Sequence, residues 1–182
     1  MLSRLSNILT LARILVIPII VMLIYMKGPL SGWIAFILFC LAGMTDYFDG
    51  YFARIRKEIS KLGIFLDPIA DKLLIASVIL ILTSKEIISD FEIIPAIIIL
   101  GREIAVSGLR EFLAKIKVSV PVSRIAKFKT VLQLIALGFL ILSEGGITFL
   151  PILLFGNIAL WVAALLTLYS GYDYLKSGLK YF

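Results

Sequence analysis

The chain has 182 residues, 61% of them hydrophobic, and 18 Lys and Arg residues against 12 Asp and Glu residues give a formal net charge of +6. A soluble domain contains about 45–50% apolar residues, so this composition predicts a single integral membrane domain over residues 1–182. Histidine is absent and Cys40 is the only cysteine, which excludes imidazole- or thiolate-based metal sites, a Ser–His triad and an internal disulfide. The positive charge indicates membrane orientation and contact with anionic lipids, and no motif suggests a nucleic-acid partner.

Six apolar stretches predict an all-α, polytopic membrane protein, since about 20 apolar residues are needed to cross the hydrocarbon core. They lie near residues 8–26, 31–53, 63–83, 91–112, 127–144 and 148–170. Turn signals separate them, for example Lys27-Gly28-Pro29. The first stretch superficially resembles a signal peptide, but it lacks a clear cleavage site and further stretches follow, so we expect a retained first helix.

Charge predicts the orientation of these helices. If the N-terminus is cytoplasmic and six helices alternate, the outer loops contain only Lys27 and Lys85 as cations. Most other lysines and arginines then lie on the cytoplasmic side. This asymmetry predicts a multi-pass protein of the cell (inner or plasma) membrane with both termini in the cytoplasm.

Four of the six aspartates lie between residues 46 and 71. Asp46 and Asp49 are three residues apart, and Asp67 and Asp71 are four apart, so each pair shares one helical face with Cβ atoms about 5–6 Å apart. A short link joins the two helices into an antiparallel hairpin, which puts both pairs near one membrane surface. Facing carboxylates repel each other unless cations relieve the repulsion, and all-oxygen ligands suit Mg²⁺, Mn²⁺ or Ca²⁺. We therefore expect a two-metal site.

The residues between the pairs suit a phosphate substrate. Gly50 leaves room for a ligand, and Arg54 can bind phosphate oxygens with two nitrogens. Gly63 allows close packing of the two helices, and Pro68 either starts a helix segment that the preceding aspartate caps or kinks a longer helix. The alternative is that these charges form interfacial salt bridges, for example between Asp49 and Arg54.

The spacing D-x2-D-G-x2-A-R-x8-G-x3-D-x3-D resembles the signature of the CDP-alcohol phosphatidyltransferase family. The matching residues are Asp46, Asp49, Gly50, Ala53, Arg54, Gly63, Asp67 and Asp71. The resemblance implies an enzyme with a cytoplasm-facing polar active-site cavity that transfers a phosphatidyl group from a CDP-linked lipid to an alcohol and releases CMP. It implies that the four aspartates bind two Mg²⁺ ions, that Asp71 is the general base, and that the protein is a homodimer. Asp46, Asp49, Gly50 and Arg54 would contact the nucleotide diphosphate.

Asn7, Thr10 and Arg13 recur at three-residue steps near the start of the first helix. Family members often carry N-x2-T-x2-R here, so the resemblance implies contact with the nucleotide of the CDP-lipid. The alternative is a helix cap, a threonine bonded to its own backbone and an arginine that reaches the membrane surface. Ser60, in the link between helices 2 and 3, is a weaker candidate for the same nucleotide.

The second half of the chain carries the information on the acceptor alcohol. Arg110, Lys127 and Lys129 can converge at the cytoplasmic surface, where three cations suit a phosphorylated acceptor. Ordinary positive-inside charge is the alternative for these residues. Arg102 and Glu103 lie well inside the fourth apolar stretch, where a buried pair that fixes helix packing is the alternative to a functional role.

The sequences G-R-E-I-x-V-S-G-L-R-E-F at 101–112 and K-x-K-T at 127–130 resemble the bacterial branch of the family that makes phosphatidylglycerophosphate. That resemblance implies CDP-diacylglycerol as donor and sn-glycerol 3-phosphate as acceptor. Another acceptor, such as serine, inositol phosphate or a second lipid, is the alternative within the family. A divalent-cation channel or transporter is the alternative from another class, because it too needs carboxylates in the membrane.

Overall fold

The structure is a computed structural model that describes residues 2–56, 61–116, 118, 124–145 and 151–181. Within these ranges the side chains of residues 2–7, 9, 46–56, 61, 62, 64, 124–127, 144 and 179 lie outside the description.

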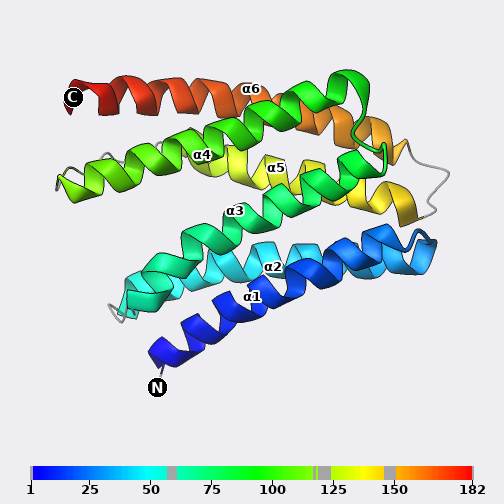
Figure 1. Cartoon of the computed structure of the whole chain (residues 1–182), viewed down its shortest axis with the longest axis horizontal. Coiled ribbons are helices and arrows are strands. Elements are labelled where there is room, and N and C mark those ends of the chain that lie inside the picture. The colour runs from blue at the N-terminus through cyan, green and yellow to red at the C-terminus, as the bar shows by residue number, and fades with distance from the viewer. Residues whose placement is uncertain (1, 57–60, 117, 119–123, 146–150, 182) are drawn as a thin grey trace.

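Six α-helices make up most of the described residues, and consecutive helices run in opposite directions (Figure 1). They are α1 (Leu2–Tyr25), α2 (Pro29–Arg56), α3 (Lys61–Ser84), α4 (Ile93–Lys115), α5 (Arg124–Leu142) and α6 (Ile152–Gly178). Short 3₁₀ helices are η1 (Asp90–Glu92), η2 (Ser143–Gly145) and η3 (Leu179–Tyr181). No β-strand occurs in the described ranges, so the prediction of an all-α protein is confirmed.

The alternating directions bring both ends of the chain to one end of the bundle (Figure 1). Leu2 and Gly178 lie there, together with the last turns of α2 and α4 and the first turns of α3 and α5. We call this region the terminal end.

One of the described helices, α6, is long and apolar enough to cross a membrane by length and composition. Shorter apolar stretches occur at Thr10–Tyr25, Pro29–Thr45 and Phe128–Leu142. In α3 and α4 the apolar sequence is interrupted by charged residues, including Asp71 and Glu103. The six predicted helices are therefore present, and α6 is the one that meets the length and composition criterion in the described residues, so six membrane spans stay a prediction.

The helices form two groups of three (Figure 1). In the first group α1 packs against both α2 and α3, and in the second α6 packs against both α4 and α5. Contacts between α2 and α5, and fewer between α3 and the helices α4 and α5, join the groups. The antiparallel arrangement of α2 and α3 agrees with the sequence, but α3 packs mainly against α1 and only slightly against α2. The residues Ile17, Ile20 and Ile24 form a buried apolar face of α1, which packs against both α2 and α3.

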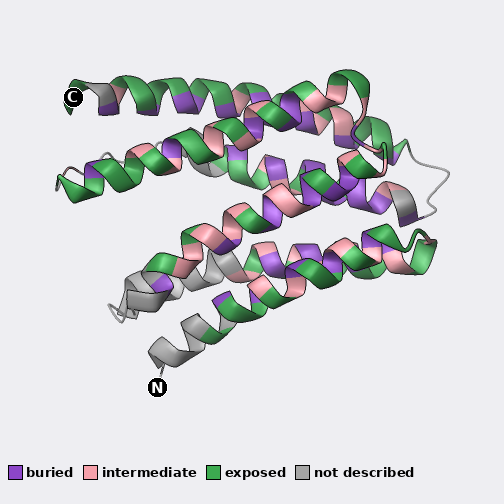
Figure 2. Cartoon of the chain, viewed as in Figure 1, coloured by how far each residue is buried: buried purple, intermediate pink, exposed green. Residues whose placement is uncertain are grey.

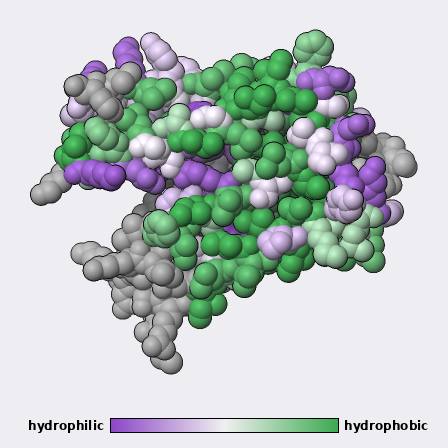
Figure 3. Space-filling view, viewed as in Figure 1, coloured by the Kyte–Doolittle hydropathy of each residue, from purple (hydrophilic) through white to green (hydrophobic). Residues whose placement is uncertain are grey.

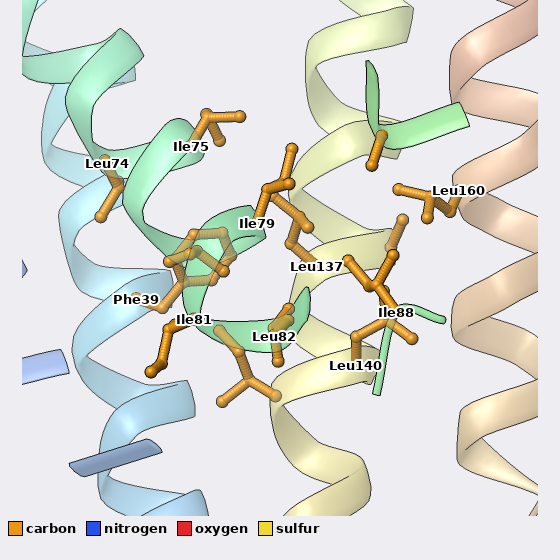
Figure 4. Close-up of a cluster of buried hydrophobic side chains, with 14 of the residues drawn as sticks. Phe39, Leu74, Ile75, Ile79, Ile81, Leu82, Ile88, Leu137, Leu140 and Leu160 are labelled. Atoms are coloured by element: carbon orange, nitrogen blue, oxygen red, sulfur yellow. The ribbon is translucent and has the colours of Figure 1, made fainter. Parts of the chain in front are cut away.

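The largest core cluster lies where the two groups meet (Figure 4). Phe39 of α2, Leu74 and Leu82 of α3, Leu137 of α5 and Leu160 of α6 are all buried in it. Most side chains on the outer surface of the bundle are exposed, and many of them are large and apolar (Figure 2). The core therefore holds the two groups together.

Glycines on the buried face of α6 allow close packing in the second group. A Cβ atom at Gly156 would lie 2.7 Å from Leu140 Cδ2, and one at Gly178 would lie 2.7 Å from Leu109 Cδ2. Small residues at such positions let helix backbones approach each other. The result is a compact three-helix unit that fixes the faces α4 and α5 present to α3.

Candidate active site

Only some of the predicted site residues have described side chains. Those with described side chains are Thr10, Arg13, Asp67, Asp71, Arg110 and Lys129. Those known only by their backbone positions are Asn7, Asp46, Asp49, Gly50, Arg54 and Lys127, and Ser60 lies outside the described residues. The roles of this second set remain predictions.

Asp67 and Asp71 project from successive turns of α3, near the terminal end of the bundle. The helix begins at Lys61 and continues through Pro68, so the interpretation in which a helix segment starts at Pro68 is wrong. Lys72 Nζ donates a hydrogen bond of 2.9 Å to the Pro68 carbonyl oxygen. Both aspartates are partly buried, and their four-residue spacing keeps them on neighbouring parts of one helical face.

Thr10 connects α1 to the first of these carboxylates. Its Oγ1 donates to Asp67 Oδ1 over 2.5 Å, and Thr10 is fully buried. The hydroxyl thus binds a carboxylate on another helix. Arg13, one turn further along α1, is only 3% exposed and so is buried within the bundle.

The backbone places the other aspartate pair at a similar depth. Asp46 lies ten residues before the end of α2 at Arg56, and Asp71 lies ten residues after the start of α3 at Lys61. At a rise of about 1.5 Å per residue, both positions are roughly 15 Å from the ends of their helices. The antiparallel directions of α2 and α3 therefore bring the two predicted pairs to one level of the bundle.

A cleft of about 440 Å³ lies between α3, α4 and α5. Figure 3 shows a hollow between the two helix groups at the terminal end, with hydrophilic residues along the side that the second group forms. Three carboxylates, those of Asp71, Glu103 and Glu111, line the cleft with the amine of Lys72. Thr130 and Gln133 of α5 supply further polar groups. One predicted catalytic residue thus stands on the wall of a cavity large enough for a small polar ligand.

The acidic wall that α4 gives to this cleft was missed by sequence reasoning. Glu103, Ser107 and Glu111 are four residues apart and line the cleft together. This spacing forms a stripe along one helical face, and the sequence signal was therefore available. It was overlooked because Glu103 was considered only as a partner of its neighbour Arg102.

A buried ion-pair network lies behind the α4 wall. Lys129 of α5, only 3% exposed, donates a hydrogen bond to Glu103 Oε1. Arg102 Nη1 lies 3.7 Å from the same oxygen, and Arg102 Nη2 donates to Ser170 Oγ of α6 over 3.2 Å. Arg102 thus links α4 to α6, which agrees with the packing interpretation of this residue. Lys129 is held next to the cleft by a carboxylate that itself faces the cleft.

Arg110 takes a different position from the other predicted acceptor-binding residues. Its guanidinium carbon lies 5.9 Å from the centre of the Tyr174 ring on α6. Neither Arg110 nor Lys129 is among the residues that line the cleft, and the side chain of Lys127 lies outside the description. Arg110 and Lys129 therefore lie outside the cleft lining, and the convergence of the three cations stays a prediction.

The described side chains alone contain no group of three potential metal ligands. Asp67 and Asp71 are two of the four predicted ligands, and the other two are known only by their backbone. A carboxylate has two oxygens, so Asp67 can accept the Thr10 hydrogen bond at Oδ1 and bind a cation through Oδ2. Such orientation of a ligand by a neighbouring hydrogen bond is common at metal sites. Asp67 and Asp71, the two predicted ligands with described side chains, therefore suit a cation that prefers oxygen ligands.

Comparison with known proteins extends these observations to the whole chain. The model of the CDP-alcohol phosphatidyltransferase family matches residues 3–169. The chain is 51% identical to the CDP-diacylglycerol–glycerol-3-phosphate 3-phosphatidyltransferase of Rickettsia bellii (strain RML369-C) over 180 residues, 99% of this chain and 98% of the relative. Proteins of the same name from Cereibacter sphaeroides and Shigella flexneri serotype 5b are each 37% identical. They match 96% of this chain and 95% and 94% of their own lengths, respectively. The eight spaced residues that resemble the family signature are thus part of a full-length similarity, and the chain belongs to the CDP-alcohol phosphatidyltransferase family.

Proposed function

We propose that this protein transfers the phosphatidyl group of CDP-diacylglycerol to sn-glycerol 3-phosphate, which yields phosphatidylglycerophosphate and CMP. The names of the relatives support this reaction. Proteins that are 37% and 51% identical to this chain over nearly their whole lengths are named for it. The observation in the structure that supports it most is the position of Asp71. This carboxylate lines the cleft between α3, α4 and α5 and lies one turn from Asp67, which is bonded to α1.

The donor lies on the side of α3 that faces α1 and α2. Asp46, Asp49, Asp67 and Asp71 hold two Mg²⁺ or Mn²⁺ ions there, and Gly50 and Arg54 contact the diphosphate. When bound, the two cations neutralise the diphosphate and the charge that develops on the leaving CMP. Asn7, Thr10, Arg13 and Ser60 contribute to the nucleotide side of this site. The Thr10–Asp67 hydrogen bond supports the inclusion of Thr10, because it holds a predicted ligand in place.

The acceptor enters the cleft between α3, α4 and α5. Asp71 accepts the proton of its primary hydroxyl, and the resulting oxygen attacks the phosphorus that carries diacylglycerol. A new P–O bond forms to the acceptor, the P–O bond to CMP breaks, and CMP leaves with that electron pair. Phosphoryl transfer needs chiefly positioning and charge neutralisation, and helices fixed at this cleft can supply both.

The acceptor phosphate is bound by cations at the cleft margin, for which Arg110, Lys127 and Lys129 are the candidates. Lys129 is the best supported, because its partner Glu103 lies on the cleft wall. Glu103, Glu111 and Asp71 make the described wall acidic, so the phosphate needs cations to offset their repulsion.

All six helices cross the membrane, with both termini and the site in the cytoplasm. The shared end of both termini and the excess of cations predicted for the cytoplasmic side support this orientation. The many large apolar residues exposed on the bundle, such as Leu15 and Leu80, suit contact with lipid tails. We also expect a homodimer, in which exposed residues of α6 such as Leu165 and Tyr172 meet the partner.

The test is the release of CMP by the purified protein with CDP-diacylglycerol and Mg²⁺. We expect release with sn-glycerol 3-phosphate and not with serine or inositol phosphate, and none after chelation of the metal. Asp71→Asn should lower the rate at least a thousandfold and leave thermal unfolding nearly unchanged, because the variant keeps the shape of the side chain and loses the base. Normal CMP release by folded Asp71→Asn would refute the base assignment. Mg²⁺ uptake by proteoliposomes without CDP-lipid would instead support a transporter.

A further inference from the structure

Gln133 of α5 stands on the cleft wall without a hydrogen bond to its carbonyl oxygen. The residue lines the cleft together with Asp71 of α3 and Glu103 of α4, yet it is only 2% exposed. Its Oε1 is buried and has no hydrogen-bond partner in the described part of the protein. Most buried side-chain polar atoms in proteins are paired, so an unpaired amide at a cleft indicates either a ligand or a bound water.

The surroundings of Gln133 define which kind of group it can bind. Thr130 lies one turn earlier on α5 and lines the same cleft. Lys129 lies four residues earlier and is already bound to Glu103. Gln133 is thus a neutral polar group, beside Thr130 and Ser107, in a wall that also carries the carboxylates of Asp71, Glu103 and Glu111. An amide offers an acceptor oxygen and two donor hydrogens, a combination that suits a hydroxyl group better than a phosphate.

We propose that Gln133 binds the non-reacting secondary hydroxyl of the polyol phosphate acceptor and thereby directs its primary hydroxyl to Asp71. This inference rests on the proposed function, because it assigns a specificity residue to the same cleft. sn-Glycerol 3-phosphate carries its secondary hydroxyl on the carbon next to the reacting one. One hydrogen bond to it fixes which of the two hydroxyls reaches the base. A site built to bind a hydroxyl also disfavours the analogue that lacks it, because the amide is then left unpaired.

The test compares two acceptors that differ only in this group, sn-glycerol 3-phosphate and 3-hydroxypropyl phosphate. CMP release is measured with each, at saturating CDP-diacylglycerol and Mg²⁺. We expect the protein to prefer glycerol 3-phosphate by about 10- to 100-fold in kcat/KM, the range for one buried hydrogen bond. In Gln133→Met the preference should fall to about threefold or less, while the KM for CDP-diacylglycerol stays unchanged.

Asn157→Leu is the matched control, since Asn157 Oδ1 is also buried and unpaired but Asn157 does not line the cleft. We expect this variant to retain the full preference of the unsubstituted protein. If Gln133→Met keeps that preference, the amide binds a water molecule or serves only helix packing, and the inference is wrong. If Gln133→Met does not fold, the comparison of the two acceptors with the unsubstituted protein still tests the inference. Equal kcat/KM for both acceptors refutes it. A protein that releases no CMP with glycerol 3-phosphate refutes the proposed function itself, a result distinct from equal use of the two acceptors.

Discussion

Replacement of Thr10 by valine tests the link between α1 and the predicted metal ligand Asp67. Valine has nearly the shape of threonine, so the fully buried site keeps its packing. The change removes the donor that lies 2.5 Å from Asp67 Oδ1 and puts a methyl group against a carboxylate oxygen. The expected defect is therefore in the orientation of the carboxylate.

The size of this defect follows from the type of bond that is lost. A hydrogen bond to a charged group contributes about 1.5–3 kcal/mol, which corresponds to roughly 10- to 150-fold in an equilibrium constant. Loss of an orienting partner of a metal ligand typically lowers metal affinity by about 10- to 100-fold. We therefore expect the Mg²⁺ concentration for half-maximal CMP release to rise about 10- to 100-fold in Thr10→Val. The maximal rate at saturating Mg²⁺ should change much less.

The assay is a Mg²⁺ titration of CMP release at fixed CDP-diacylglycerol and glycerol 3-phosphate. Thr10→Ser is the control, because it keeps the hydroxyl and loses only a methyl group, so it should stay within about threefold of the unsubstituted protein. Unchanged Mg²⁺ dependence in Thr10→Val would show that the hydrogen bond does not position a ligand. Equal defects in both variants would assign the effect to packing.

Two further predictions concern stability and are measured by thermal unfolding in detergent. Gly156→Ala should lower stability by about 1–3 kcal/mol, because the added Cβ would lie 2.7 Å from Leu140 Cδ2. Gly101→Ala has no atom within 4 Å of the added Cβ and should raise stability by about 0.5–1 kcal/mol, so equal shifts in the two variants would contradict the packing of α6. Glu103→Gln should cost about 3 kcal/mol because it leaves the buried amine of Lys129 without its carboxylate, and adding Lys129→Met should recover most of the loss. An unchanged Tm in Glu103→Gln would show that this pair is not needed for stability.

The number, order and approximate limits of the helices could be predicted from the sequence. Apolar stretches of helical length and the turn signals between them are local features, and the helices lie within several residues of the predicted ranges. The neighbours of each helix could not be predicted in the same way. The short link makes α2 and α3 antiparallel, but it does not determine how closely they pack. That depends on the whole apolar face of α1, whose Ile17, Ile20 and Ile24 are buried in the core.

The candidate site could be predicted where its chemistry repeats at helical spacing. The spacing of Asp67 and Asp71 placed them on one face of one helix, and Thr10 was singled out by its regular spacing from its neighbours. The acidic face of α4 and Gln133 were missed because their significance depends on a cleft shared by three helices. Arg110 illustrates the same limit, since its distance from Tyr174 depends on how α4 packs against α6.

The place of α3 at the edge of the first group, next to α4 and α5, has a consequence for how new acceptors can be accommodated. Its Asp67 is bonded to α1 within the first group, and its Asp71 opens onto a cleft whose other walls are α4 and α5 of the second. On the proposed function, the chemistry common to every acceptor belongs to α1–α3, and the selection among acceptors belongs to two helices that carry none of the four aspartates. Substitutions on α4 and α5 can therefore exchange one alcohol for another without rebuilding the machinery that handles the nucleotide. The fold is in this sense modular, with α3 belonging to the first module and forming one wall of the cleft against the second.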